Sequence, residues 1–196
     1  MNEPNVIVPN NMSEAIVRGL PGEDPLELLK RCGGLGNCTR AENQPTSGPV
    51  IVAEFTMDFA KAEQHPPVVT YLASILINQA LELIPQVDVF CGLWELGSVL
   101  AYSLATTCNR RYSLLGPVHT GRHSRRAEFI WHSIQKGDRV AVVADELTSE
   151  YLMQANEAVS KSGGELVGAF CFCDCLPEGS WHKTPVVSIV RKVAIE

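Results

Sequence analysis

Residues 137–154 limit the possible folds more than any other stretch of the sequence. A Gly-Asp turn leads into four apolar residues at 140–143, and after Ala144 come two acids, a Thr-Ser pair and a helical pattern through Ser160. Buried strands and amphipathic helices give such patterns when a short polar segment separates them. This stretch therefore predicts a strand, a short polar loop and a helix.

The polar residues of this loop are suited to binding an anion. A helix N-terminus presents N–H groups without intrahelical partners and the positive end of the helix dipole. Asp145 and Glu146, at the end of the strand, can hold a pair of ribose hydroxyls or water bound to Mg²⁺, while Thr148 and Ser149 can donate hydroxyls to a phosphate. A plain strand-to-helix junction with a capping threonine explains the same residues.

A second strand, loop and helix follow the same plan. The short, mostly apolar strand predicted at 87–91 leads into a loop that has Gly92 near its start, Gly97 near its end and Glu95 between them, and a helix is predicted over 99–106. Glycines let backbone N–H groups approach a ligand closely, although an ordinary connection between a strand and a helix uses them too. The sequence thus contains two candidate binding loops.

Strand and helix patterns alternate along the rest of the chain. Apolar residues at helical spacing predict a helix over 68–83, and strands are predicted at 50–59, 110–115, 166–175 and 185–190. This order predicts an α/β fold with a mostly parallel central sheet and helices on both faces. Ligands of such sheets sit outside the carboxyl ends of the strands, where both candidate loops lie.

The N-terminal part predicts a small helical cap in front of this sheet. One helix is expected from Ser13 and another from Asp24, because each position can cap a helix. Residues 33–49 are rich in turn-forming residues, which predicts a loop or hairpin over the core. We expect residues 1–48 to form the cap and loop and residues 49–196 to form the α/β core, together as one compact unit.

Charge and composition argue against several classes of partner. The formal net charge is −6, which gives no general attraction to nucleic acid or to an anionic membrane. The N-terminus lacks the basic start and apolar core of a secretory signal, and no apolar run approaches the length of a bilayer span. The seven cysteines form an odd set without a dense disulfide framework, so reduced thiols and a cytoplasmic location are expected.

The cysteines do not predict a metal site. Cys32 and Cys38 lack a second close Cys or His pair, so a zinc site there is weakly supported. Alternation along a strand places Cys171, Cys173 and Cys175 on one face. Three thiols in a row on one strand are too collinear to surround a tetrahedral metal, so the first two are interpreted as small apolar packing residues.

A local basic cluster contrasts with the acidic balance of the chain. It lies in a predicted polar loop over 116–127, and its members are His119, Arg122, His123, Arg125 and Arg126. One interpretation is a cover that neutralises a polyphosphate, and the other is a solvated surface loop.

These motifs, in this order, resemble the type I phosphoribosyltransferases, and the orotate phosphoribosyltransferases in particular. The stretch 137–154 resembles the phosphoribosyl pyrophosphate motif of that family, and the loop 92–98 resembles its pyrophosphate loop. The basic residues at 119–126 resemble its catalytic loop, and the last two predicted strands continue the orotate pattern. The similarity covers roughly residues 48–193, with several motifs in agreement.

The resemblance implies transfer of ribose 5-phosphate from phosphoribosyl pyrophosphate to a nitrogenous base, in nucleotide biosynthesis or salvage. It implies Mg²⁺ bound with the phosphoribosyl pyrophosphate, a nucleotide monophosphate as the other ligand, and a homodimer. The implied catalytic residues are Asp145, Arg122, His123, Arg125 and Arg126. The implied ligand-binding residues are Gly92, Glu95, Gly97, Glu146, Thr148 and Ser149.

Three departures from the family pattern fall on the chemistry. Ala144 stands in place of the first of two strand acids, and Glu150 stands in place of a glycine in the phosphate loop. A carboxylate at that second position repels a phosphate, and its Cβ obstructs close backbone approach. Cys175 replaces an arginine suited to a substrate carboxylate. Two hypotheses stay open: a divergent phosphoribosyltransferase, and a non-catalytic protein of the same fold with a ligand-sensing, regulatory or interaction role.

Overall fold

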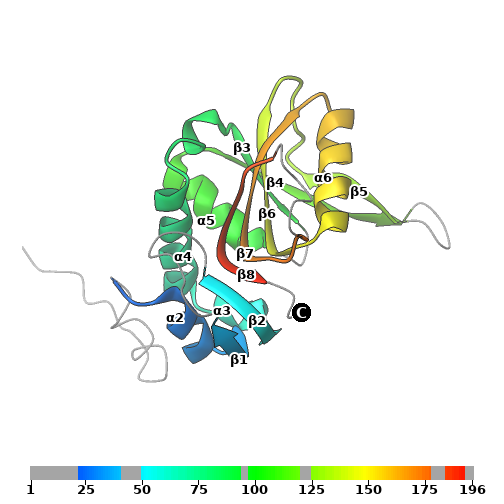
Figure 1. Ribbon diagram of the computed structural model, residues 1–196. Coiled ribbons are helices and arrows are strands. Elements are labelled where there is room, and N and C mark those ends of the chain that lie inside the picture. The colour runs from blue at the N-terminus through cyan, green and yellow to red at the C-terminus, as the bar shows by residue number, and fades with distance from the viewer. Residues whose placement is uncertain (1–21, 41–49, 94–96, 120–124, 178–183, 193–196) are drawn as a thin grey trace, which may run out of the picture.

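A computed structural model describes residues 22–40, 50–93, 97–119, 125–177 and 184–192. One eight-stranded sheet runs through the molecule, with helices on both of its faces (Figure 1). In chain order the elements are α2 (Pro25–Arg31), β1 (Leu35–Arg40), β2 (Val50–Met57), α3 (Phe59–Glu63), α4 (Pro66–Gln79), η1 (Ile84–Gln86), β3 (Val89–Leu93), α5 (Ser98–Cys108), β4 (Arg111–His119), β5 (Arg125–Trp131), β6 (Arg139–Leu147), α6 (Ser149–Lys161), β7 (Glu165–Asp174) and β8 (Val186–Lys192).

The strand order in the sheet is β1-β2-β8-β7-β6-β3-β4-β5. All pairings from β2 to β4 are parallel, whereas β1 and β5 pair antiparallel at the two edges. The predicted fold class, an α/β fold with a mostly parallel central sheet, is confirmed. Parallel strands bring their carboxyl ends to one edge of the sheet, so the ends of β3, β6, β7 and β8 lie together.

Two hydrophobic clusters hold the helices against the two faces. Leu72 of α4 and Leu104 of α5 pack with Phe90 and Val143 on one face, while Leu152 and other residues of α6 pack with Val142 on the other face. Neighbouring residues of β6 enter different clusters because side chains of a strand alternate between faces. Figure 1 shows α4 and α5 on one side of the sheet and α6 on the other.

The N-terminal unit differs in part from the prediction. Asp24 caps α2, since its side chain accepts a hydrogen bond from the Leu26 N–H at 2.8 Å, and the predicted helix is confirmed. Of the stretch predicted as loop or hairpin, residues 35–40 form β1, which pairs antiparallel with β2 and supports the hairpin alternative. The helix predicted from Ser13 lies outside the described residues.

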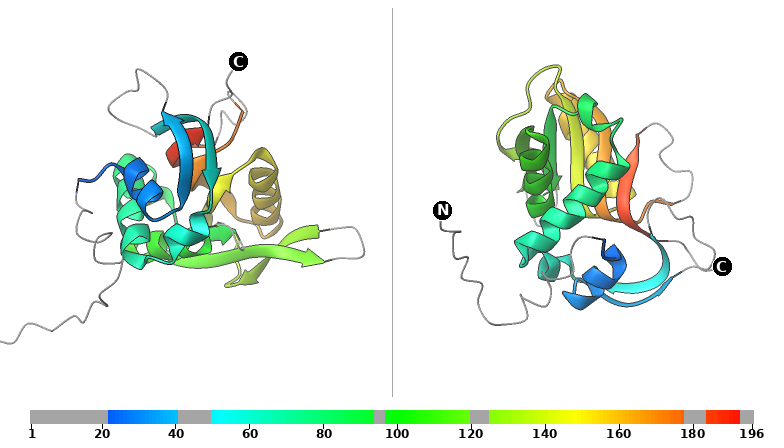
Figure 2. Two further views of the ribbon diagram at one scale, coloured as in Figure 1. Left: turned by 90° about the horizontal axis from the view of Figure 1, so that it is seen from below. Right: turned by 90° about the vertical axis from the view of Figure 1, so that its left-hand side faces the viewer.

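The polar loop predicted over 116–127 is wrong in part, because β4 and β5 form an antiparallel hairpin there. β4 continues to His119, which pairs with Arg125, and Val118 pairs with Arg126. The β5 sequence, RRAEFIW, ends in apolar and aromatic residues that favour a strand. The left panel of Figure 2 shows this hairpin extending beyond the rest of the sheet.

The helix predicted over 68–83 is also shorter than expected. α4 begins at Pro66 and ends at Gln79, and a separate turn of 3₁₀ helix follows. Throughout the described parts of the chain, every helix falls short of the length or the apolar character needed to cross a membrane.

Candidate functional site

The junction between β6 and α6 is shorter than the sequence predicted. β6 extends to Leu147 and α6 begins at Ser149, so Thr148 alone connects the strand to the helix. The Thr148 hydroxyl accepts a hydrogen bond from the Tyr151 N–H at 3.3 Å, which makes it the N-cap of α6. The predicted polar loop is therefore reduced to one residue, which caps the helix.

Glu150 does not fill a phosphate cradle. Its side chain is exposed in the first turn of α6 and accepts a hydrogen bond from Gln154 Nε2 at 3.1 Å. An acid in the first turn is favourable because it complements the positive end of the helix dipole. The same charge opposes an incoming phosphate at this helix end.

The junction between β3 and α5 is built by glycines. Gly97 has a φ of +93° and serves as the N-cap of α5 without a side-chain hydrogen bond. A Cβ on Gly97 would lie 2.6 Å from the Cα of Ala144, and a Cβ on Gly92 would lie 2.9 Å from the Cα of Ser98. Both positions therefore require glycine. Gly97, at the end of the loop, packs directly against Ala144 of β6, the position at which the family pattern has its first acid.

Two carboxyl groups lie at this second junction, one buried and one partly buried. Asp145 is 5% exposed, and burial, with the charges of Glu63 and Glu146, raises its pKa to about 8. Glu63, the last residue of α3, accepts a hydrogen bond from the Val99 N–H in the first turn of α5, and burial raises its pKa. Asp145 Oδ1 and Glu63 Oε1 are both buried without a hydrogen-bond partner among the described residues. At neutral pH Asp145 is mostly protonated, because a carboxyl in a buried acidic site disfavours its charged form.

Glu146 follows Asp145 on the strand and has a different environment. Its side chain is half-buried, and burial raises its pKa although the charge of Lys192 on β8 opposes that shift. Successive strand side chains point to opposite faces. The two acids of the motif are therefore not arranged as a pair toward one ligand.

A cation from β8 lies beside Asp174, the acid at the end of β7. Arg191 Nε lies 3.6 Å from Asp174 Oδ2, and Asp174 also accepts a hydrogen bond from the Leu176 N–H at 2.9 Å. In the family pattern an arginine follows this acid directly, at the position of Cys175. In this chain a guanidinium lies beside the acid from the neighbouring strand β8.

The structure brings together only part of the predicted site. Asp145, Gly92, Gly97, Thr148 and Ser149 lie at the carboxyl edge of the sheet, as expected from their strands. Arg125 and Arg126 are strand residues at the start of β5. Glu95, Arg122 and His123 lie outside the described residues.

Sequence reasoning missed Glu63 and Arg191. Glu63 ends a five-residue helix and has no local motif around it, so only the tertiary contact with α5 reveals it. Arg191 could have been identified from the sequence, because it follows a predicted strand at its carboxyl end, where ligands of parallel sheets bind.

The donor atoms at this edge do not fit a magnesium ion held by the protein alone. No group of three or more His, Cys, Asp or Glu side chains in the described ranges is placed to hold a metal. Mg²⁺ needs ionised oxygen ligands in octahedral geometry, whereas the raised pKa of Asp145 favours its protonated form. The phosphates of a ligand would have to supply the charge.

Taken together, the parallel sheet, the helices on both faces and the two junctions at its carboxyl edge define an open α/β protein. Several solved structures share this arrangement. The orotate phosphoribosyltransferase from Aeropyrum pernix has a TM-score of 0.64 at 16% identity, covering 85% of this chain and 92% of that one. That from Mycobacterium tuberculosis H37Rv, in complex with inorganic phosphate, has a TM-score of 0.54 at 19% identity and covers 90% and 92%.

A purine enzyme matches as well. The adenine phosphoribosyltransferase from Trypanosoma brucei, in complex with AMP, pyrophosphate and ribose-5-phosphate, has a TM-score of 0.57 at 14% identity, covering 87% of this chain and 81% of that one. No protein-family model and no curated protein sequence matches the chain. The chain therefore has the fold of the type I phosphoribosyltransferases, which confirms at the level of fold the resemblance seen in the sequence.

Proposed function

We propose that this protein uses the phosphoribosyltransferase fold to bind a ribose-containing ligand, in a sensing or regulatory role, without efficient phosphoribosyl transfer. The observation that carries this proposal is the one-residue junction at Thr148. A hydroxyl that caps α6 and a helix that begins at once leave no loop of free residues to surround a 5′-phosphate.

The N-terminus of α5, the second helix end at this edge, also has an N–H group that already donates to a side chain of the protein. Glu63 accepts from the Val99 N–H of α5, where the pyrophosphate loop of a transferase would offer its N–H groups to an anion. A pyrophosphate placed there would meet the Glu63 carboxyl group beside a buried Asp145, and a carboxylate at close range repels an anion.

The same two acids favour a hydroxyl-bearing ligand. Asp145 Oδ1 and Glu63 Oε1 are buried oxygens without partners among the described residues, and an unsatisfied buried acceptor costs about 1–3 kcal/mol. Ribose hydroxyls can donate to both oxygens and remove that cost. A nucleoside or nucleotide monophosphate is the class of ligand that carries such a diol.

Two measurements on purified protein test this proposal. With Mg²⁺, phosphoribosyl pyrophosphate and a panel of nitrogenous bases, we expect no release of pyrophosphate above background. Calorimetry with nucleosides and nucleotide monophosphates is expected to show binding that Asp145→Asn weakens. Rapid pyrophosphate release with any base would overturn the proposal.

Substitutions that remove only a negative charge distinguish how much each junction opposes an anionic ligand. Glu63→Gln keeps an acceptor for the Val99 N–H but removes a charge, so we expect it to improve the affinity for phosphoribosyl pyrophosphate. Glu150→Gln is the matched variant at the exposed junction, where a smaller gain is expected because solvent screens the charge. No gain in either variant would show that these carboxylates are not what opposes the anion.

The second candidate is a divergent phosphoribosyltransferase. Its support is Asp145, kept at the end of β6, together with Arg191, which supplies a cation beside Asp174. In that case pyrophosphate release would be measurable, and Asp145→Asn would reduce it. The family resemblance also suggests a homodimer in the cytoplasm, which sedimentation and cell fractionation would test.

A further inference from the structure

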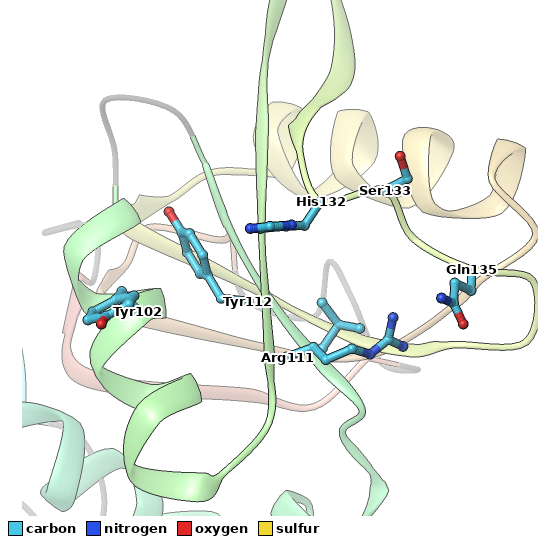
Figure 3. A pocket seen from close by; sticks show the side chains of 7 residues that line it. Tyr102, Arg111, Tyr112, His132, Ser133 and Gln135 are labelled. Carbon is cyan, nitrogen blue, oxygen red and sulfur yellow. The ribbon is translucent and has the colours of Figure 1, made fainter.

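A separate pocket lies at the other end of the strands. It has a volume of about 490 Å³, and its lining includes the first residues of β3 and β4 and the chain that follows β5: Val89, Tyr102, Arg111, Tyr112, His132, Ser133 and Gln135. Figure 3 shows the rings of Tyr102 and Tyr112 with His132 toward one side and the Arg111 guanidinium beside Gln135 toward the other. None of these residues belongs to the candidate site at the carboxyl edge.

The pocket forms because β5 covers only part of the edge of β4. Pairing between these strands begins at Leu114 and Trp131, so the first residues of β4 have no β5 partner in the described register. The chain leaves β5 through His132, which has a φ of +53°, and the His132 carbonyl accepts a hydrogen bond from Ser113 Oγ at 2.7 Å. A left-handed conformation at a non-glycine residue is held only where surrounding contacts fix it.

Two tyrosines give the pocket an aromatic wall. The rings of Tyr102 and Tyr112 meet edge to face, with centroids 5.8 Å apart, and Tyr102 is 61% exposed. Such contacts orient both rings before a ligand arrives. An exposed aromatic side chain beside a cavity offers a face on which a planar ring can stack.

The opposite side of the pocket has a guanidinium held in place. Arg111 Nη2 donates to Asp138 Oδ1, and Asp138, which is 8% exposed, also accepts from the Gln135 N–H at 2.6 Å. This carboxylate fixes the arginine through one nitrogen. A planar guanidinium with several N–H groups can then donate to a ligand oxygen from its other nitrogens.

We propose that this pocket binds a planar aromatic molecule that carries an acidic oxygen group. The ring stacks on the face of the exposed Tyr102, which Tyr112 holds in place through its edge-to-face contact, and the oxygen group accepts hydrogen bonds from Arg111. The volume lies within the range of about 300–1,000 Å³ typical of small-molecule sites, and a mostly apolar wall with a few fixed polar groups is the usual composition of such sites. This site is independent of the ribose-binding proposal, because it lies at the opposite end of the strands.

Fluorescence titration with two probes that share one aromatic framework tests the proposal. Anilinonaphthalene sulfonate carries a planar naphthalene ring and a sulfonate anion, and phenylnaphthylamine is its neutral counterpart. We expect the sulfonate to bind the wild-type protein about tenfold more tightly, since Arg111 donates to its oxygens. Arg111→Lys keeps the charge but loses the planar fork, and it should remove most of this preference while leaving the neutral probe unchanged.

Variants of the two-tyrosine wall form the second part of the probe-binding test. Tyr102→Ser should weaken both probes about fivefold, whereas Tyr102→Phe keeps the ring and should bind as wild type. Met153→Ser is the matched control, because Met153 is 55% exposed on α6, away from the pocket. Melting curves verify that each variant is folded. Equal binding by the wild type and Tyr102→Ser, or equal affinity for the two probes, would overturn the proposal.

Discussion

Two strand-to-helix junctions at one edge of the sheet cap their helices in different ways. At the β6–α6 junction a threonine side chain caps the helix, and the acid of the first turn, Glu150, is exposed. At the β3–α5 junction a glycine with φ +93° caps the helix without a side chain, and the acid, Glu63, comes from another element and is partly buried.

The difference shows what each junction can offer a ligand. At the locally capped helix end, the Thr148 hydroxyl already accepts from one of the first N–H groups and the first-turn acid faces solvent, so a ligand gains less there. A glycine junction allows close packing and encloses polar groups, which leaves Asp145 and Glu63 with unpartnered oxygens among the described residues. Binding is therefore expected at the β3–α5 junction, to which the motif stretch 137–154 contributes Asp145.

The largest expected effect comes from Gly97→Ala. The new Cβ would lie 2.6 Å from Ala144 Cα, in a left-handed conformation. The conformation costs about 1–2 kcal/mol and overpacking about 1–3 kcal/mol more, so the free energy of unfolding should fall by roughly 3 kcal/mol. Urea unfolding measures this change.

Gly137→Ala is the matched control for that substitution. Gly137 has a φ of +87°, but a Cβ there would meet nothing within 4 Å. We expect it to cost only the conformational part, about 1 kcal/mol. Equal losses in the two variants would contradict the close packing of the β3–α5 junction.

The next effect concerns the pH dependence that buried Asp145 imposes. Its folded-state pKa of about 8 lies above the unfolded value of about 3.9, so the folded protein holds the extra proton between these values. The contribution of Asp145 to stability is full below about pH 4 and is lost as the pH rises toward 8. Asp145→Asn should remove this loss and be more stable than wild type at pH 8, by a few kcal/mol at most.

Asp88 provides a control with the opposite sign. Hydrogen bonds from Arg139 lower the pKa of Asp88 to about 2, so its contribution is present above about pH 4 and is lost as the pH falls toward 2. Asp88→Asn should leave the slope between pH 5 and pH 8 unchanged. A wild-type stability that stays constant over that interval would contradict the burial of Asp145.

Much of the fold was predictable from local patterns. The alternation of strand and helix patterns predicted the parallel sheet, and Asp24 predicted the start of α2. Strand β5 was missed because Arg125 and Arg126 at its start belong to a basic cluster that indicates a loop, while the pairing with β4 that stabilises it is tertiary.

The site was less predictable than the fold. Glycines at 92 and 97 were recognised, since tight junctions require them. The extension of β6 through Glu146 and Leu147 shortened the predicted loop to Thr148, because pairing with β7 continues to Asp174. Glu63 had no signal in the sequence, because its role depends on how α3 meets α5 and not on neighbouring residues.

A smaller effect is expected from Thr148→Ala, which tests whether the β6–α6 junction is a capped helix start. Loss of the hydroxyl leaves the Tyr151 N–H without its acceptor, and removal of an N-cap costs about 1 kcal/mol. Thr148→Ser keeps the oxygen and should be nearly neutral in thermal unfolding. If the alanine variant were as stable as wild type, the hydroxyl would not act as a cap.

The smallest effect is expected from Glu150→Gln. The carboxylate sits in the first turn of α6, where it interacts with the helix dipole, and it accepts from Gln154. Glutamine keeps an acceptor oxygen, so only the charge is lost, and an exposed charge at a helix end contributes about 0.3–1 kcal/mol at low ionic strength. The loss should shrink in about 1 M salt, where the screening length is only about 3 Å. Glu63 is partly buried whereas Glu150 is exposed, so the effect of Glu63→Gln on stability should depend less on salt. Equal salt dependence in the two variants would contradict the difference in burial between the two junctions.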